Sequence, residues 1–64
     1  MKKRYKIWIT FESEIEEYEN CSDIVFNNSG FFNFLMHFDD KTFVTIGINT
    51  SKILMYEVQE TINE

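Results

Sequence analysis

The sequence predicts a small, mainly β protein, an antiparallel meander of five or six strands curled as a barrel or a sandwich. Aromatic and β-branched residues alternate with other residues in several short runs, which is the period of a strand. Turn-forming residues separate these runs at a spacing of roughly 8–12 residues, which is typical of small antiparallel folds. The chain has 64 residues and no proline, and we expect residues 1–64 to form one domain.

The first expected strand runs from Arg4 to Phe11. Its odd-numbered positions from residue 5 onward are apolar or aromatic, whereas Lys6 and Thr10 flank Trp8 on the other face. We expect Trp8 to cover a neighbouring strand or to act as an exposed anchor for a partner, since tryptophan is enriched at binding hot spots.

The acidic segment that follows has two interpretations. Ser13 and Glu16 fit a capping box, which predicts a short helix near residues 13–20. Alternatively, residues 12 and 13 form a turn and residues 14–19 pair back on the first strand. We favour the hairpin, because so few residues make a marginal helix and an acidic strand discourages pairing at a sheet edge.

A short strand over residues 23–26 and a turn over residues 27–30 lead into a central meander from Phe31 to Val58. The meander is predicted as three antiparallel strands, over residues 31–38, 43–48 and 53–58, joined by turns at 39–42 and 49–52. The last residues, 60–64, are polar and are expected to fray.

The meander carries large apolar residues on both faces. The even-numbered face of its first strand is assigned to the core and comprises Phe32, Phe34, Met36 and Phe38. Phe31 and Phe43 are expected to be exposed, and to form a protein interface if they meet Ile53 and Met55. A sheet that is apolar on both sides is curled, covered or buried in an oligomer, and we expect a homodimer or higher homo-oligomer.

No catalytic, metal or cofactor site is predicted. His37 is the only histidine and Cys21 the only cysteine, whereas a zinc site takes three or four such ligands. We expect Cys21 to be a structural thiol, and neither the serines nor His37 with Asp39 or Asp40 forms a recognisable catalytic set. The absence of a disulfide, a signal peptide and a membrane span predicts a cytoplasmic protein. Because no convergent set of titratable groups can be assembled from the sequence, we expect that the protein is not an enzyme.

Charge is segregated along the chain, whose formal net charge is −5. Four basic residues lie among the first six, whereas five glutamates lie between residues 12 and 19. Such an acidic segment repels nucleic acid and steers basic partners, so direct nucleic-acid binding is not expected. The predicted partner-binding residues are Trp8, Glu12, Glu14, Glu16, Glu17, Glu19, Phe31 and Phe43.

The chain is short and acidic, has no alanine, and is rich in amino acids that are encoded by A/T-rich codons. In these respects it resembles small proteins carried by phages of low-GC Gram-positive bacteria. Some of these block host defence enzymes, as anti-CRISPR proteins do. The resemblance implies a stoichiometric inhibitor of a nucleic-acid-handling host protein, acting in the host cytoplasm. The alternatives are a small barrel that binds single-stranded nucleic acid through the basic start and aromatics, and a homo-oligomeric structural component of a phage.

Overall fold

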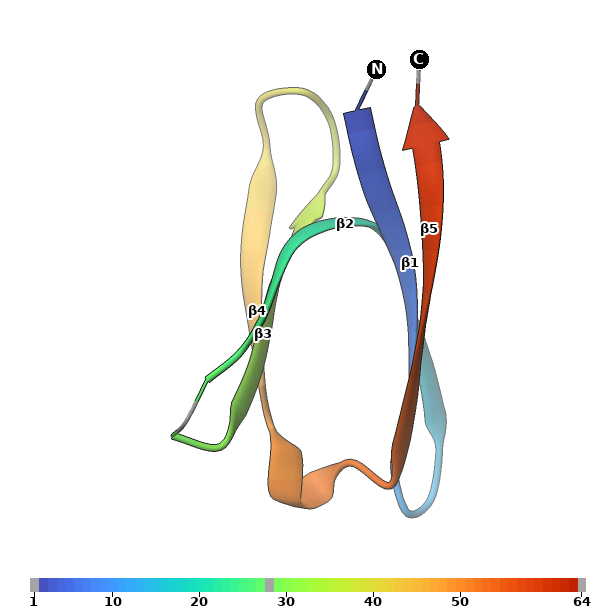
Figure 1. The fold of residues 1–64 in the computed structure, drawn as a ribbon, viewed down its shortest axis with the longest axis vertical. Coiled ribbons are helices and arrows are strands. Elements are labelled where there is room, and N and C mark those ends of the chain that lie inside the picture. The colour runs from blue at the N-terminus through green and yellow to red at the C-terminus, as the bar shows by residue number, and fades with distance from the viewer. Residues whose placement is uncertain (1, 28, 64) are drawn as a thin grey trace.

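The computed structural model describes residues 2–27 and 29–63 as one five-stranded antiparallel sheet. The mainly β class is therefore confirmed. The strands follow the order β4-β3-β2-β1-β5 across the sheet (Figure 1). The elements are β1 (Lys2–Thr10), β2 (Ile15–Phe26), β3 (Phe31–His37), β4 (Phe43–Asn49), the 3-10 helix η1 (Thr50–Lys52) and β5 (Met55–Asn63).

The acidic segment forms a hairpin with the first strand, as favoured from the sequence, and the helix alternative is wrong. Thr10 pairs with Ile15 and Trp8 with Glu17. The turn closes where the N–H of Phe11 donates to the carbonyl of Glu14 at 2.7 Å. Because β1 already presents a strand edge, the alternating segment gains a full ladder of hydrogen bonds that a helix of one or two turns cannot match.

β2 is one bent strand, whereas the sequence predicted two separate ones. Asn20 and Asp23 adopt positive φ values of 58° and 54°, and the pairing register shifts beside both residues. The bend lets Cys21 pair with Tyr5 of β1 on one side and with Met36 of β3 on the other. β2 consequently arches between two halves of the molecule, one holding β1 and β5 and the other holding β3 and β4 (Figure 1).

The central meander is wrong in its third strand, because β5 does not pair with β4. The segment after β4 coils into η1, where the Asn49 side chain accepts from the Ser51 N–H. The Thr50 N–H then donates to the Gly30 carbonyl at 2.9 Å, and the Leu54 N–H to the Thr10 carbonyl at 2.9 Å. With these two bonds the chain crosses the molecule, and β5 then pairs with the free edge of β1.

β5 is also longer than predicted. Its pairing with β1 extends from Met55 opposite Thr10 to Asn63 opposite Lys2. Residues 60–63, which we expected to fray, therefore belong to the sheet, because β1 offers them backbone partners over its whole length. Glu64 lies outside the described residues.

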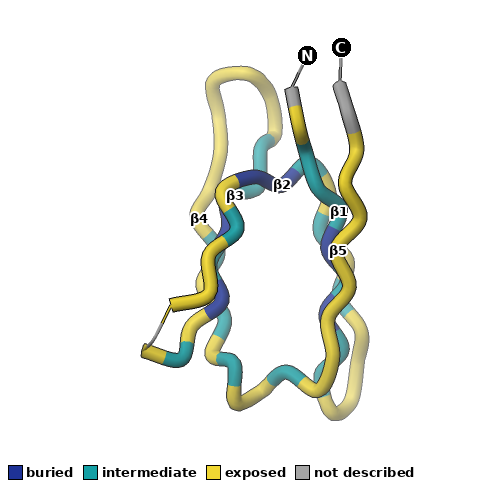
Figure 2. Tube along the Cα trace, viewed as in Figure 1, coloured by how far each residue is buried: buried dark blue, intermediate teal, exposed yellow. Residues whose placement is uncertain are grey.

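The core lies on the inner face of the bent sheet, between its two halves (Figure 2). Its buried members are Ile7, Ile9, Cys21, Phe32 and Phe34. The core assignment of Phe32 and Phe34 is confirmed, and Met36 packs against them partly buried.

The assignment of Phe38 to the core is wrong, because 60% of this residue is exposed. β3 ends at His37, and the Phe38 N–H already donates to the Thr42 carbonyl in the next turn. The alternation of a strand therefore no longer fixes the direction of the Phe38 side chain.

The sheet is bent but not closed, since β4 and β5 are its two ends. Inward-facing side chains beside those ends remain half-exposed, among them Val44 at 40%, Val58 at 41% and Tyr56 at 46%. Closure into a barrel would have covered them. The core that results is small, and two edges are left without a neighbouring strand within the described residues.

Candidate protein-binding face

Three neighbouring strands, β2, β1 and β5, present one face directed away from the core. Residues directly opposite each other in antiparallel strands share a face, so the pairing defines two rows across it. Ile15, Thr10 and Met55 form the first row, and Glu17, Trp8 and Glu57 form the second. We call this surface the β1 outer face; its members are Lys6, Trp8, Thr10, Ile15, Glu17, Glu19, Met55, Glu57 and Gln59.

Trp8 lies at the centre of the β1 outer face. Its indole N–H donates to the Glu17 carboxylate at 2.8 Å, and Lys6 Nζ lies 5.2 Å from the ring centroid in a cation–π contact. These two contacts fix the orientation of the indole while leaving the side chain partly exposed. An aromatic side chain held in one orientation loses little conformational entropy on binding, which suits Trp8 to anchor a partner.

Lys6 of β1 forms ion pairs with two glutamates of β2. Its Nζ lies 3.2 Å from Glu19 and 3.5 Å from Glu17. The hydrogen bond to the Glu19 carboxylate raises the pKa of Lys6. With three glutamates against this single lysine, the β1 outer face stays negatively charged, and Glu57 makes no ion pair within the described part of the chain.

The apolar end of the β1 outer face is strongly exposed. Ile15 is 67% exposed and Met55 52%, and both pair with Thr10. Scattered apolar side chains on a surface need no explanation, but an exposed apolar row beside a tryptophan resembles protein interfaces, in which Trp and Met are enriched. The acidic row is not part of that composition, since Glu is depleted at interfaces, but it sets the charge that a partner must complement. The arrangement can hold an apolar side chain of a partner with a basic group next to it.

The other predicted acidic residues do not join this face. Glu16 pairs with Ile9 and lies on the opposite side of β2, where it accepts a hydrogen bond from the Tyr18 hydroxyl. Burial, followed by that bond, raises the pKa of Tyr18 to about 12. Glu12 and Glu14 lie in the exposed turn between β1 and β2. Strand alternation thus divides the acidic segment among two faces and a turn.

Phe31 and Phe43 are exposed, by 42% and 53%, but the structure does not bring them together. Phe31 pairs with Asn49 and Phe43 with His37, which are the two ends of the β3–β4 ladder. Ile53 packs against the core instead, and Met55 belongs to the β1 outer face. The single aromatic patch considered from the sequence therefore does not form.

Two basic residues at the start of the chain, Lys3 and Lys6, form ion pairs with glutamates. Lys3 lies 3.8 Å from Glu60, and Lys6 is held by Glu17 and Glu19 as above. Arg4 donates to the carbonyl of Lys3. Phosphate binding would have to compete with these carboxylates, which weakens the electrostatic term on which nucleic-acid affinity depends.

Sequence reasoning missed a polar cluster at the bend of β2. Ser22 Oγ lies 2.6 Å from Nε2 of His37 and donates to Asp23 Oδ2 at 2.7 Å. The hydroxyl and the His37 ring can donate or accept according to the tautomer of the ring. We call this cluster of Ser22, Asp23 and His37 the clasp, because it joins the bend of β2 to the last residue of β3. Ser22 and His37 lie 15 positions apart in the sequence, and no sequence motif predicts their contact.

The thiol of Cys21 lies in the core. Cys21 is fully buried, and burial raises the pKa of its thiol to about 11, which fits the structural thiol expected from the sequence. Within residues 2–27 and 29–63, no group of three or more His, Cys, Asp or Glu side chains is placed to hold a metal ion.

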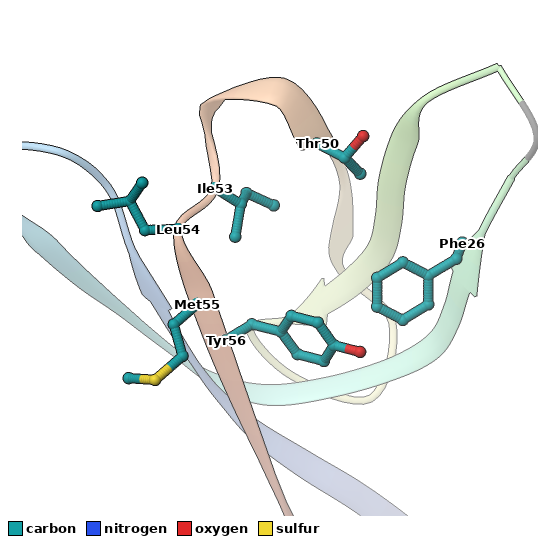
Figure 3. A pocket seen from close by; sticks show the side chains of 6 residues that line it. All are labelled: Phe26, Thr50, Ile53, Leu54, Met55 and Tyr56. Carbon is teal, nitrogen blue, oxygen red and sulfur yellow. The ribbon is translucent and has the colours of Figure 1, made fainter.

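A pocket of about 420 Å³ opens at the end of the molecule where η1 crosses between the two halves (Figure 3). It is lined by Phe26, Thr50, Ile53, Leu54, Met55 and Tyr56. The rings of Phe26 and Tyr56 are 5.1 Å apart, and Phe26 stacks on the buried Phe32 at 4.4 Å. The described lining residues are mostly apolar, with the hydroxyls of Thr50 and Tyr56 as their polar groups, so the pocket is suited mainly to apolar contact.

No family model, curated protein or solved structure matches this chain. None of the helices in the described part of the chain is long and apolar enough to cross a membrane.

Proposed function

We propose that the protein is a small acidic protein-binding module that inhibits a nucleic-acid-handling host protein by stoichiometric contact. The β1 outer face is its docking surface. The observation that carries the proposal is the row across β2, β1 and β5 in which Trp8 stands between Glu17 and Glu57. An oriented aromatic anchor flanked by carboxylates and exposed apolar residues suits a basic, partly apolar surface of another protein.

A basic surface of this kind is found on proteins that bind nucleic acid. In the proposed function the glutamates occupy positions that phosphates would otherwise take, which prevents the partner from engaging nucleic acid. CRISPR effectors and other defence complexes are partners of this class, and the size and composition of the chain agree with a phage origin. The host cytoplasm is the compartment in which such an inhibitor would act.

The test uses purified nucleic-acid-binding proteins of low-GC Gram-positive bacteria, CRISPR effector complexes among them. Binding is measured by calorimetry, and release of a labelled DNA duplex is measured in parallel. We expect one-to-one binding to at least one of these proteins, with loss of its DNA binding at saturation. A complex that retains full DNA binding would contradict inhibition.

Two matched double variants test the docking surface. E17Q with E57Q removes two charges from the β1 outer face, and glutamine still offers Trp8 an acceptor oxygen. E12Q with E14Q removes the same charge from the nearby turn. We expect the first pair to raise the dissociation constant at least about tenfold, which is about 1.4 kcal/mol, and the second pair to change it less. Equal effects would contradict the assignment to this face.

A labelled single-stranded oligonucleotide serves as the competing probe. Affinity that falls steeply with salt is the mark of phosphate binding, and finding it here would overturn the proposed function in favour of a nucleic-acid-binding barrel.

A further inference from the structure

The two edges of the sheet differ in their chemistry. β5 carries Glu57 and Glu60, whereas β4, Phe43–Asn49, contains no charged residue. An edge strand exposes unpaired backbone N–H and C=O groups, and proteins usually protect it with charges, proline or a bulge. β4 has neither charge nor proline, and its register with β3 runs without a shift from end to end. β4 is therefore the edge that is open to another strand.

The side chains of β4 also lack cover. Val44 is 40% exposed although it faces the same side as the buried Phe34, because β4 is the last strand at this end of the sheet. Phe43 is 53% exposed, and its ring centroid lies 5.6 Å from that of His37. A further strand alongside β4 would cover Val44 and continue the inner face.

We propose that this strand is β4 of a second copy, paired antiparallel about a two-fold axis at Ile46. In that register Val44 of each copy lies opposite Ile48 of the other, and the two Ile46 residues face each other. Directly opposite residues share a face, so the apolar inner faces of the two sheets become continuous. On the outer side, Thr45 of each copy lies opposite Gly47 of the other, and the Asn33 side chain of β3 lies over that glycine.

Charge supports this occupant. The two-fold axis brings the β3–β4 turn of one copy, with Asp39 and Asp40, to the end of the pairing where η1 of the other copy carries Lys52. Self-pairing of β5 centred on Val58 or Gln59 would instead bring Glu57 near its copy on the outer face and Glu60 near its copy on the inner face, and like charges across a strand pair are destabilising. A second copy therefore fits the β4 edge and not the β5 edge.

The contact is small for a protein interface. Seven paired residues a side fall below the 20–30 residues a side of a standard stable interface, so the dimer is expected to dissociate on dilution. It uses a surface separate from the β1 outer face, and its test is independent of the proposed function.

The test is the mass in solution by light scattering across an about hundredfold range of concentration, over which a weak dimer should dissociate. We expect the mass to rise from 7.7 kDa towards twice that value. Thr45→Lys places a charge at the exposed centre of the β4 edge and should leave the chain monomeric throughout. Gln59→Lys places the same charge at the β5 edge and should dimerise like the unchanged protein.

Amide hydrogen exchange gives a readout that does not depend on a variant. We expect amides within residues 43–49 to gain protection as concentration rises, while those of residues 55–61 do not. A wild-type protein that stays monomeric over the whole range would overturn the proposal. Dimerisation of Thr45→Lys, or its loss in Gln59→Lys alone, would do the same.

Discussion

The hydroxyl of Ser22 lies 2.6 Å from Nε2 of His37, joining the bend of β2 to the last residue of β3. The Asn20 side-chain amide makes a second link at the same place by donating to the His37 carbonyl at 3.1 Å. Asn20 and Asp23, the two non-glycine residues with positive φ in the described part of the chain, flank Cys21 and Ser22 at this bend. The only histidine of the chain thus holds the bend on which the two-halved shape depends.

Replacing Ser22 with alanine should lower the free energy of unfolding by about 1–2 kcal/mol. Ser22 is 8% exposed and its hydroxyl contacts both Asp23 and His37, and a hydrogen bond contributes about 0.5–1.5 kcal/mol, or more with a charged partner. Urea denaturation followed by circular dichroism measures the change. Ser29→Ala, at an exposed turn position, is the matched control and should leave the midpoint unchanged. Equal midpoints for the two variants would show that the clasp contributes nothing.

Asn20 offers a test of the strain at the bend. Asn20→Ala should destabilise the protein more than Asn20→Gly, although both variants lose the hydrogen bond to His37. Alanine pays about 1–2 kcal/mol to adopt a left-handed conformation, whereas glycine adopts it without a steric cost. The expected order of unfolding midpoints is Asn, then Gly, then Ala. An alanine variant at least as stable as the glycine variant would mean that the bend relaxes.

Local pattern was sufficient to predict most strands and the direction of their side chains. Alternation alone placed Trp8 on the face of β1 that is directed away from Ile7 and Ile9. It also placed Phe32 and Phe34 in the core. It also favoured the hairpin after Phe11. Alternation failed at Phe38, because a strand pattern in the sequence continues past the residue at which pairing stops.

Alternation did not predict the connections between distant segments. The partner of β5 depends on the bonds from Thr50 to Gly30 and from Leu54 to Thr10, which link residues far apart in the chain. The bend in β2 depends on two residues in a conformation that asparagine and aspartate tolerate but do not demand. For the candidate site, the glutamates were visible, but which of them share a face with Trp8 required the register.

The stability of the protein should fall at alkaline pH, beginning near pH 9. Burial raises the pKa of Cys21 from 9.0 to about 11, so between these values the folded state binds more protons than the unfolded state. Stability then decreases as pH rises. Tyr18, raised from 10.0 to about 12, adds a loss of the same sign at higher pH.

Unfolding midpoints in urea between pH 7 and pH 11 measure this dependence. Cys21→Ala removes the first contribution, and its midpoint should begin to fall only about one pH unit later, whatever its stability at neutral pH. A thiol reagent supplies an independent check, since the folded protein should react much more slowly than the urea-unfolded chain. Parallel pH curves for the two proteins would contradict a buried, protonated thiol.

Two phenylalanine substitutions distinguish the core from its surroundings. Phe32→Ala should lower the free energy of unfolding by about 3–5 kcal/mol, which is a large part of the roughly 3–10 kcal/mol expected for a chain of this length. Phe38→Ala removes the same atoms from a residue that is 60% exposed and should cost less than about 1 kcal/mol. Amide dispersion in NMR spectra and urea midpoints report both outcomes. If Phe38→Ala were as damaging as Phe32→Ala, the first strand of the meander would continue into the core as its alternation suggests, and β3 would not end at His37.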